Sequence, residues 1–264
     1  MRASFSPNYS NGAAVNIKPV ALVSGANKGI GLQIAKELAS KGFKVLVGTR
    51  KLDLGVVAAR SVGAEAEAIQ LDVTDHASIA AAARQIEDTL GRLDVLVNNA
   101  GISRPIQPGT PIEEMRDADK VSRVSVADMR VVFETNVFGV VAVTQAMLPL
   151  LRRAPAGRIV NISSAGGSLA LKGNPSEYSR QYVGVYQTSK TALNAVTQAF
   201  AIELEETNIK VNAACPGFTA TDLSNYAPGA GSVEDAAREP VRLALLDANG
   251  PTGTFSNADG PLPW

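Results

Sequence analysis

The chain has 264 residues, of which 45% are hydrophobic and 19% charged, a composition ordinary for a soluble globular enzyme. Because 25 Lys and Arg residues balance 25 Asp and Glu residues, with no dense basic stretch, we expect no nucleic-acid partner. Cys215 and His76 are each the only residue of their type, so we expect no intramolecular disulfide and no metal site. A Ser-His-Asp triad would need His76 as its base, but its place beside a predicted helix start favours an exposed or capping role. Cys215 is expected to pack as a buried thiol.

Residues 1–18 form a polar, Ser- and Asn-rich leader, which we expect to be flexible. The leader lacks the apolar core of a secretory signal peptide. The most apolar stretch, residues 137–151, is too short to span a bilayer and contains polar positions. We therefore expect a soluble cytoplasmic protein with no membrane partner.

Short, mostly apolar and β-branched runs then recur along residues 19–264. They lie at 19–25, 43–49, 66–73, 93–100, 157–164 and 209–217, with a weaker seventh near 252–256. Continuous apolar runs, in place of alternating ones, are typical of strands that are covered on both faces.

Amphipathic helices are predicted between these strands, because apolar residues recur every three or four positions. The stripes are Ile30, Ile34 and Leu38 in the first helix, Ile79, Ala83, Ile86 and Leu90 in the third, and Leu193, Val196, Phe200 and Leu204 after Tyr186. The alternation favours an α/β, single-domain Rossmann fold: a doubly wound parallel sheet of about seven strands with helices on both faces.

Two connections, residues 103–125 and 165–185, are longer than a compact α/β domain needs. Both follow predicted strands at the carboxyl edge of the sheet, where ligands bind in this architecture. We expect them to be lid-like insertions over a substrate; the alternative is that they are structureless surface loops.

The segment VSGANKGIG links the first predicted strand to the first predicted helix. Gly25 allows a sharp turn, Gly29 allows the backbone to approach a pyrophosphate, and Gly31 allows the helix to pack closely on the sheet. The helix N-terminus then offers N–H groups and the positive end of its dipole to the phosphates. A glycine pattern alone is a weak signal, but this placement predicts a dinucleotide site.

The end of the second predicted strand selects the cofactor. NAD(H)-binding enzymes place a carboxylate there for the ribose 2′-OH, whereas this chain has Thr49 followed by Arg50 and Lys51. A guanidinium can hold a 2′-phosphate through two hydrogen bonds, and Lys28 in the glycine loop adds a second cation. These residues favour NADP(H) over NAD(H); the alternative is that they are only solvated surface charges.

In YQTSK, Tyr186 and Lys190 lie four residues apart and so share one face of a helix. A neighbouring ammonium favours the phenolate, so we expect Lys190 to lower the pKa of Tyr186 toward the working range of a proton donor. Such a pair is common by chance and is weak evidence alone. Ser164, at the end of the strand GRIVNISS, strengthens it, because a hydroxyl there can stabilise negative charge on a substrate oxygen. Ser163 is the alternative, although neighbouring strand residues face opposite sides.

The glycine spacing resembles the T-G-x-x-x-G-x-G signature of the short-chain dehydrogenase/reductase family, with Ser24 in place of the threonine. LDV, LVNNAG, NISS, YQTSK and PGFTATD resemble further motifs of the family and follow in its order. The cofactor-binding residues that the resemblance and the loop chemistry imply are Ser24, Gly25, Asn27, Lys28, Gly29, Ile30, Gly31, Arg50, Asp72, Val73, Asn98, Ala100, Gly101, Tyr186, Lys190, Pro216, Gly217, Thr219 and Thr221.

Within this set the resemblance implies distinct roles. Asp72 and Val73 would contact the adenine, residues 98–101 would support the sheet and lie against the adenosine ribose, and Thr219 and Thr221 would meet the nicotinamide carboxamide. Asn136, in FETNVFGV, matches the helix asparagine that helps to hold a water between the lysine and solvent. The implied catalytic residues are Ser164, Tyr186, Lys190 and Asn136.

The distance between serine and tyrosine departs from the family, because 21 residues separate Ser164 from Tyr186 where about a dozen are usual. Tyr178 lies nearer the usual spacing, but Tyr178 and Tyr182 each have a tyrosine at the lysine position. We interpret the excess as a substrate-side insertion similar to that of carbonyl-reductase-like members. It leaves the subunit number open; a homo-oligomer, dimer or tetramer, is expected, with a monomer as the alternative.

The expected function is NADPH-dependent reduction of a ketone or other carbonyl substrate to an alcohol. Alternatives within the family are a 3-oxoacyl-thioester reductase and a sugar or steroid dehydrogenase. A non-catalytic NADP-sensing protein on the same fold is the alternative from another class. Apolar residues such as Ile102, Ile106 and Met115 in the first long connection favour apolar ketones or keto esters, while Arg104, Arg116 and Arg123 are the cations beside them.

Overall fold

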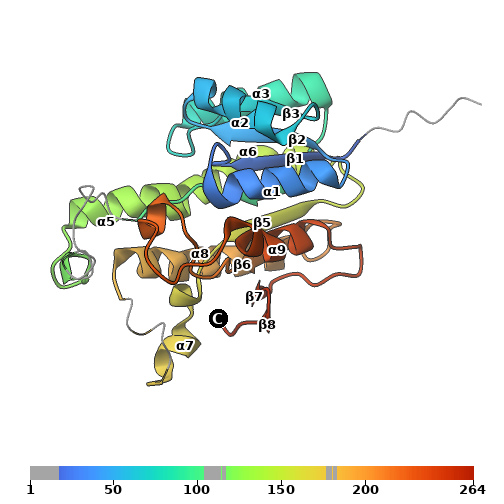
Figure 1. Ribbon diagram of the computed structural model, residues 1–264. Helices are drawn as coiled ribbons and strands as arrows, with labels where there is room; N and C mark the ends of the chain where they lie inside the picture. Colours follow the sequence, from blue (N-terminus) through green and yellow to red (C-terminus); the bar gives the residue numbers. More distant parts are fainter. Residues whose placement is uncertain (1–17, 104–113, 115–116, 177–179, 181–182) are drawn as a thin grey trace, which may run out of the picture.

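The computed structural model describes residues 18–103, 114, 117–176, 180 and 183–264. Within them, eight strands form one sheet in the order β3-β2-β1-β4-β5-β6-β7-β8 (Figure 1). Neighbouring strands from β3 to β7 pair in parallel, and β8 alone pairs antiparallel, with β7. The strands are β1 (Val20–Ser24), β2 (Lys44–Thr49), β3 (Ala66–Gln70), β4 (Val95–Asn98), β5 (Arg158–Ile162), β6 (Lys210–Ala214), β7 (Phe255–Asn257) and β8 (Gly260–Pro261).

The seven predicted strands are confirmed, each shorter than its apolar run at one or both ends. The strands have continuous apolar sequences because both faces of the sheet are covered, as expected. In β1, Val20 and Leu22 belong to one hydrophobic core, whereas Ala21 and Val23 belong to the other. The eighth strand was not predicted, since two residues after a tight turn carry no periodic pattern.

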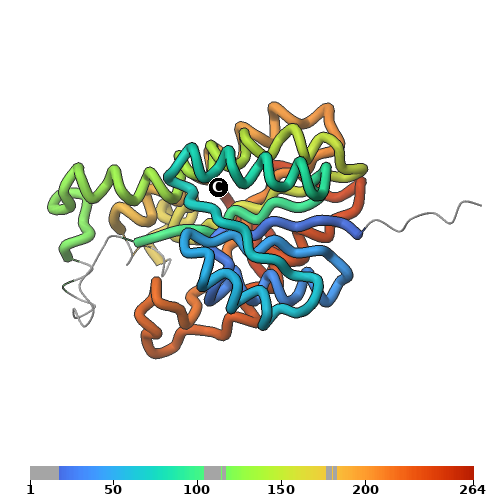
Figure 2. The backbone as a smooth tube through the Cα atoms, turned by 90° about the horizontal axis from the view of Figure 1, so that it is seen from above, coloured from blue at the N-terminus to red at the C-terminus, as the bar shows by residue number. Residues whose placement is uncertain are grey.

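Helices cover the two faces in sets of three. On one face α1 (Gly29–Ser40), α2 (Leu52–Val62) and α9 (Val233–Ala244) share a core with the sheet. On the other face lie α3 (His76–Leu90), α6 (Gly139–Leu151) and α8 (Val185–Glu203). Figure 2, seen from above, shows α3 and α6 along one side of the sheet and α1 along the other. The doubly wound prediction is therefore confirmed.

The predicted apolar stripes face these cores. Ile34 and Leu38 of α1 are fully buried, as are Leu193 and Leu204 in and just after α8. His76 is the exposed first residue of α3, whose N-cap is Asp75, in agreement with the expected surface role. Cys215 is buried directly after β6, as expected.

The apolar stretch of residues 137–151, which precedes β5, belongs to a longer continuous helix. Helix α5 (Val126–Phe133), the π-helical turn η1 (Glu134–Phe138) and α6 follow one another without a break. The expectation that this stretch is too short to span a membrane is therefore wrong. The helix that contains it, residues 126–151, is long enough and apolar enough for a membrane span. Half of its most apolar window is buried, and Val143, Met147 and Leu151 pack in the core, which is the burial of a core helix.

The two long connections contain short elements in their described parts. In the second, the 3-10 turn η2 (Ala165–Gly167) is followed by α7 (Leu169–Gly173), whose N-cap is Ser168. The first long connection lies mostly outside the described residues, and so do Tyr178, Tyr182 and the leader up to residue 17.

Candidate active site

A cavity of about 1470 Å³ opens at the carboxyl ends of the parallel strands. The segments that follow β1 to β6 all contribute to its wall. Strands β1 and β4 are neighbours at the centre of the sheet. The chain continues from β1 to β2 and β3 on one side and from β4 to β5 and β6 on the other. The carboxyl ends of β1 and β4 are therefore the topological switch point, where α/β proteins bind ligands. The described ends of both long connections also line the cavity, through Ser103, Leu171 and Val183 among others. That these segments act as lids stays a prediction.

The glycine loop has the backbone geometry of a phosphate cradle. Gly25 and Gly29 have φ angles of +64° and +57°, which residues with a Cβ adopt at a cost. A methyl on Gly31 would clash with the side chain of Asn99 and would lie 2.8 Å from the carbonyl oxygen of Gly25. Lys28, the N-cap of α1, makes no side-chain capping hydrogen bond, and the first turn of α1 holds no acid. The N–H groups at this helix end are therefore available to an anion, and the residues fit a pyrophosphate.

Ser24 and Asn98 lie behind the cavity wall and hold the strands together. The Ser24 hydroxyl accepts hydrogen bonds from the backbone N–H groups of Asn99 and Ala100, both at 3.0 Å. The Asn98 amide donates to Thr144 Oγ1 at 3.1 Å and to Asn161 Oδ1 at 2.9 Å, inside the core. The side chain of Asn98 therefore supports the sheet, as the resemblance implied, but does not face the cavity. Asn99 faces it instead.

The other predicted cofactor residues line the cavity together. Thr49, which ends β2, Arg50 and Lys51 form its wall beside Asp72 and Val73. Arg50 and Lys51 are exposed and form no ion pair with any residue that the structure describes. An uncompensated guanidinium at this strand end fits a phosphate better than a ribose hydroxyl. The remaining lining residues of the predicted set are Gly25, Asn27, Lys28, Gly29, Ile30, Gly31, Ala100, Gly101, Tyr186, Lys190, Pro216, Gly217, Thr219 and Thr221.

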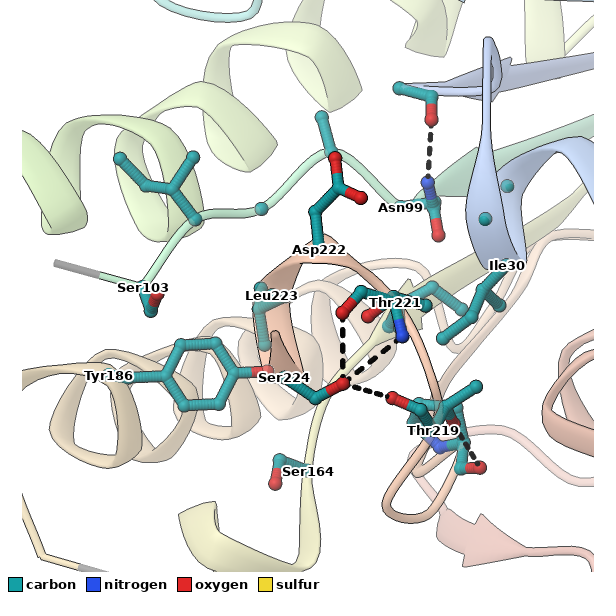
Figure 3. Close-up of a pocket in the computed structure, with 18 of the residues that line it drawn as sticks. Ile30, Asn99, Ser103, Ser164, Tyr186, Thr219, Thr221, Asp222, Leu223 and Ser224 are labelled. Atoms are coloured by element: carbon teal, nitrogen blue, oxygen red, sulfur yellow. Dashed lines mark hydrogen bonds between the residues drawn. The ribbon is translucent and has the colours of Figure 1, made fainter. Parts of the chain in front are cut away.

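The predicted reacting groups come from β5 and α8. Tyr186 and Lys190 lie in the first turns of α8, with the Lys190 Nζ atom 5.5 Å from the centre of the Tyr186 ring. Lys190 is only 3% exposed, and its ammonium donates to the backbone oxygen of Ile162 at 2.6 Å. Figure 3 shows the Tyr186 ring and the Ser164 side chain facing the same part of the cavity. The spacing of 21 residues between them is thus compatible with a shared site.

Burial dominates the titration of both α8 groups. Desolvation raises the pKa of the Tyr186 phenol, and the nearby Cys215 thiol adds to that effect. Desolvation also lowers the pKa of the Lys190 amine to about 8, against a smaller opposing effect of Cys215. The expected net lowering of the Tyr186 pKa is therefore wrong, because desolvation shifts it in the opposite direction. At neutral pH the phenol keeps its proton, which is the state that a proton donor requires.

The two serines at the end of β5 have separate surroundings. Ser163 is 1% exposed and its hydroxyl bonds to Asn194 inside the protein. Ser164 lines the cavity, and its hydroxyl accepts a bond from the backbone N–H of Gly166 at 3.2 Å, which leaves its proton free to donate. The geometry therefore selects Ser164, the second serine, as the one that a substrate can reach.

Asn136 sits in the π-helical turn η1, fully buried and behind the cavity wall. Its amide donates to the Ile102 carbonyl and accepts from the Ile102 N–H, both at 2.8 Å, and donates to Ser189 Oγ at 3.0 Å. A Cβ on Gly101 would lie within 3.6 Å of both Asn136 Oδ1 and Lys190 Nζ, so the two side chains flank the same glycine. Asn136 thus ties the segment after β4 to α8; its role in holding a water stays a prediction.

The segment after β6 supplies an apolar wall that the sequence did not reveal. Phe218, Leu223 and Tyr226 line the cavity although each is more than 40% exposed. They lie within the ten residues after the PG dipeptide, whose Gly217 has a φ of +77°. Val183 and Leu171 add apolar surface from the second long connection.

Known proteins resemble the chain over most of its length. A family model described as short chain dehydrogenase matches residues 19–229. The chain is 38% identical over 237 residues to the short-chain dehydrogenase anuI of Penicillium roqueforti, covering 86% of this chain and 88% of that protein. It is 33% identical to (-)-isopiperitenone reductase of Mentha piperita, covering 93% of this chain and 98% of the reductase. The solved structure of NADPH-bound carbonyl reductase from chicken fatty liver matches with a TM-score of 0.76 at 28% identity, covering 94% of this chain and 99% of that one.

Proposed function

The chain belongs to the short-chain dehydrogenase family, and we propose that it is an NADPH-dependent reductase of a ketone or related carbonyl substrate. The observation that carries the proposal is that Ser164, Tyr186 and Lys190 meet at one cavity whose other end holds the basic residues Arg50 and Lys51. A bound nicotinamide would supply the hydride; the protein's own residues must then stabilise and protonate the carbonyl oxygen.

The roles of these residues follow from their surroundings. Ser164 donates a hydrogen bond to the carbonyl oxygen as negative charge develops on it. Tyr186 gives that oxygen a proton, because burial keeps the phenol protonated at neutral pH. The Lys190 ammonium, 5.5 Å from the ring centre, then stabilises the phenolate that remains.

We propose NADP(H) rather than NAD(H) as the cofactor. Thr49 stands where a carboxylate would select NAD(H), and Arg50 beside it has no acidic partner in the described part of the chain. A 2′-phosphate would supply that partner. Direct titration with NADP⁺ and NAD⁺ measures the preference, and tighter binding of NAD⁺ would refute it.

We propose that the substrate is apolar on the side away from its carbonyl. Phe218, Leu223, Tyr226 and Val183 present exposed apolar surface to the cavity, where a substrate would cover it. A sugar would leave this surface without a complementary partner. A carrier-bound 3-oxoacyl chain remains the second candidate, because it is apolar too.

Consumption of NADPH with a panel of substrates tests the activity. The panel comprises cyclic and linear ketones, keto esters, a 3-oxoacyl thioester and a sugar, and we expect turnover with the ketones and keto esters. Tyr186→Phe should lower kcat by about 10²-fold or more, because the proton donor is lost. Absence of turnover with every substrate would favour a non-catalytic NADP-sensing protein. Full turnover in Tyr186→Phe would instead refute Tyr186 as the proton donor.

Subunit number and location are proposals as well. Exposed Val126, Val131 and Phe138 lie along the helix of residues 126–151, and we propose that a second copy of the chain covers them in a homo-oligomer. Light scattering measures the mass directly, and a monomer at micromolar concentration would refute this. The cytoplasmic location expected from the sequence stays a prediction.

A further inference from the structure

An ion pair joins the two sides of the cavity mouth. Lys28, in the glycine loop, bonds through Nζ to Asp222, in the one-turn helix η4 (Asp222–Ser224) after β6. Lys28 is also one of the two cations assigned above to the 2′-phosphate. We propose that Asp222 is a specificity-determining residue, which competes with the 2′-phosphate of NADP(H) for the Lys28 ammonium and so moderates the preference over NAD(H). This inference rests on the proposed use of NADP(H).

The Asp222 carboxylate is held in place rather than free on a loop. Its second oxygen accepts a hydrogen bond from the Tyr226 hydroxyl at 2.8 Å. Figure 3 shows Asp222 on a turn in which Ser224 bonds to Thr219 and Thr221; the Ser224 hydroxyl lies 2.7 Å from the Thr219 carbonyl oxygen. A carboxylate fixed in this way loses little freedom when it binds a cation.

The backbone around this turn is constrained as well. Asn225 and Tyr226 both have a φ of +51°, a conformation that residues with a Cβ rarely adopt and that persists where the surroundings impose it. The base of the segment is closed where the Gly231 N–H donates to the Phe218 carbonyl at 2.8 Å and the Ala220 N–H donates to the Gly231 carbonyl at 2.9 Å.

The turn also lies close to the glycine loop. A Cβ on Gly29 would lie 3.5 Å from the Thr221 methyl group, an ordinary van der Waals contact. This close approach of the two loops is consistent with the ion pair between Lys28 and Asp222. The pair is therefore a defined contact between the nucleotide side and the substrate side of the cavity.

The charges around the pair make Lys28 the shared group. The Lys28 ammonium and the Tyr226 hydroxyl hold the pKa of Asp222 below its usual value, so the carboxylate is ionised at neutral pH. Arg50 and Lys51 form no ion pair with the described residues and have no acid to release when a phosphate binds. Only Lys28 must exchange one anion for the other. Because the Lys28 side chain is 64% exposed, the competition is worth no more than about a fivefold change in affinity.

Calorimetric dissociation constants for NADP⁺ and NAD⁺ test the inference without any turnover. The variants are Asp222→Asn, Lys28→Met and the double variant, with Asp88→Asn on the exposed surface of α3 as the matched control. Asp222→Asn removes a negative charge near every phosphate and is expected to tighten both nucleotides. The ratio of the two constants is therefore the readout.

We expect Asp222→Asn to shift the ratio toward NADP⁺ by about two- to fivefold, and Asp88→Asn to leave it unchanged. In the Lys28→Met background the same substitution should leave the ratio unchanged, because the shared cation is gone. An equal gain for both nucleotides, or a ratio shift that persists without Lys28, would overturn the inference. Equal wild-type affinities for the two nucleotides would instead refute the cofactor assignment.

Discussion

Lys190→Met tests how much the buried, charged amine of Lys190 lowers the free energy of unfolding. The Lys190 amine is 3% exposed, and its pKa falls from 10.5 to about 8 through desolvation. Each unit of pKa corresponds to about 1.4 kcal/mol, so holding the charged amine at neutral pH costs the folded state about 3 kcal/mol. Methionine has a similar length and no charge. The variant loses the bond to the Ile162 carbonyl, worth about 1 kcal/mol, and should still be more stable than wild type at pH 7 by about 2 kcal/mol.

The pH dependence separates this effect from simple repacking. The folded-state pKa of Lys190 is depressed, so between pH 8 and 10.5 the unfolded chain binds more protons at this site, and the unfolding free energy of wild type rises with pH. From pH 7 to pH 10 wild type should gain about 2.5 kcal/mol relative to Lys190→Met. The advantage of the variant should therefore vanish or reverse at pH 10.

Urea unfolding of both proteins at pH 7, 8, 9 and 10, without added nucleotide, measures the difference. Lys36→Met, at an exposed position on α1, is the matched control and should show no pH-dependent difference from wild type. A difference between wild type and Lys190→Met that stays constant across this range would refute the depressed pKa. Loss of turnover in the same variant is expected, since the phenolate of Tyr186 loses its neighbouring cation.

Three further outcomes are expected. Ser164→Ala should lower kcat by about 10²-fold, because one hydrogen bond to the developing oxyanion is lost. Ser163→Ala should keep kcat and lower the melting temperature. Equal losses of kcat in the two variants would contradict the assignment. The rate of reduction should be level below pH 8 and fall above it, as Lys190 loses its proton at a pKa of about 8, and Lys190→Arg should move that fall to higher pH. Gly31→Ala should destabilise the fold by about 1–3 kcal/mol and weaken nucleotide binding, because its methyl would lie 2.8 Å from a carbonyl oxygen. Gly173→Ala is the control in urea unfolding, because no atom lies within 4 Å of an added Cβ there. Equal effects of the two substitutions would refute the packing argument.

Local sequence patterns were sufficient to predict the fold, because the spacing of apolar residues identifies which face of each helix or strand is buried. The apolar residues of β1 alternate between two cores, which is why an unbroken apolar run identifies a strand covered on both sides. Strand β8 and the short helix α7 had no such pattern, since they are too short for a period to repeat. The continuous helix over residues 126–151 was not predicted, because its first segment, α5, is less apolar and packs less deeply than α6.

Candidate site residues could be predicted from motifs, but the direction of each side chain could not. In LVNNAG the two asparagines are equivalent in sequence; the pleat of β4 sends Asn98 into the core and leaves Asn99 at the cavity. The apolar wall of Phe218, Leu223 and Tyr226 depends on where one loop crosses the cavity mouth, and no local pattern encodes that position. Tertiary contacts decide both features.

The pKa of Tyr186 shows the same limit and bears on the proposed proton transfer. A lysine one turn away predicts a lowered pKa, yet the protein surrounds both groups closely enough for desolvation to outweigh the ammonium. The phenol then keeps its proton across the neutral range, as the proposed proton donor must, and the depressed pKa of Lys190 keeps that amine close to its own titration point. Reduction consumes a proton from the phenol and needs the protonated form, whereas oxidation of an alcohol needs the phenolate as a base. Desolvation therefore keeps the proton on the phenol at neutral pH, which is the form that the proposed reduction needs, while the net direction of the reaction follows the cofactor and substrate ratios.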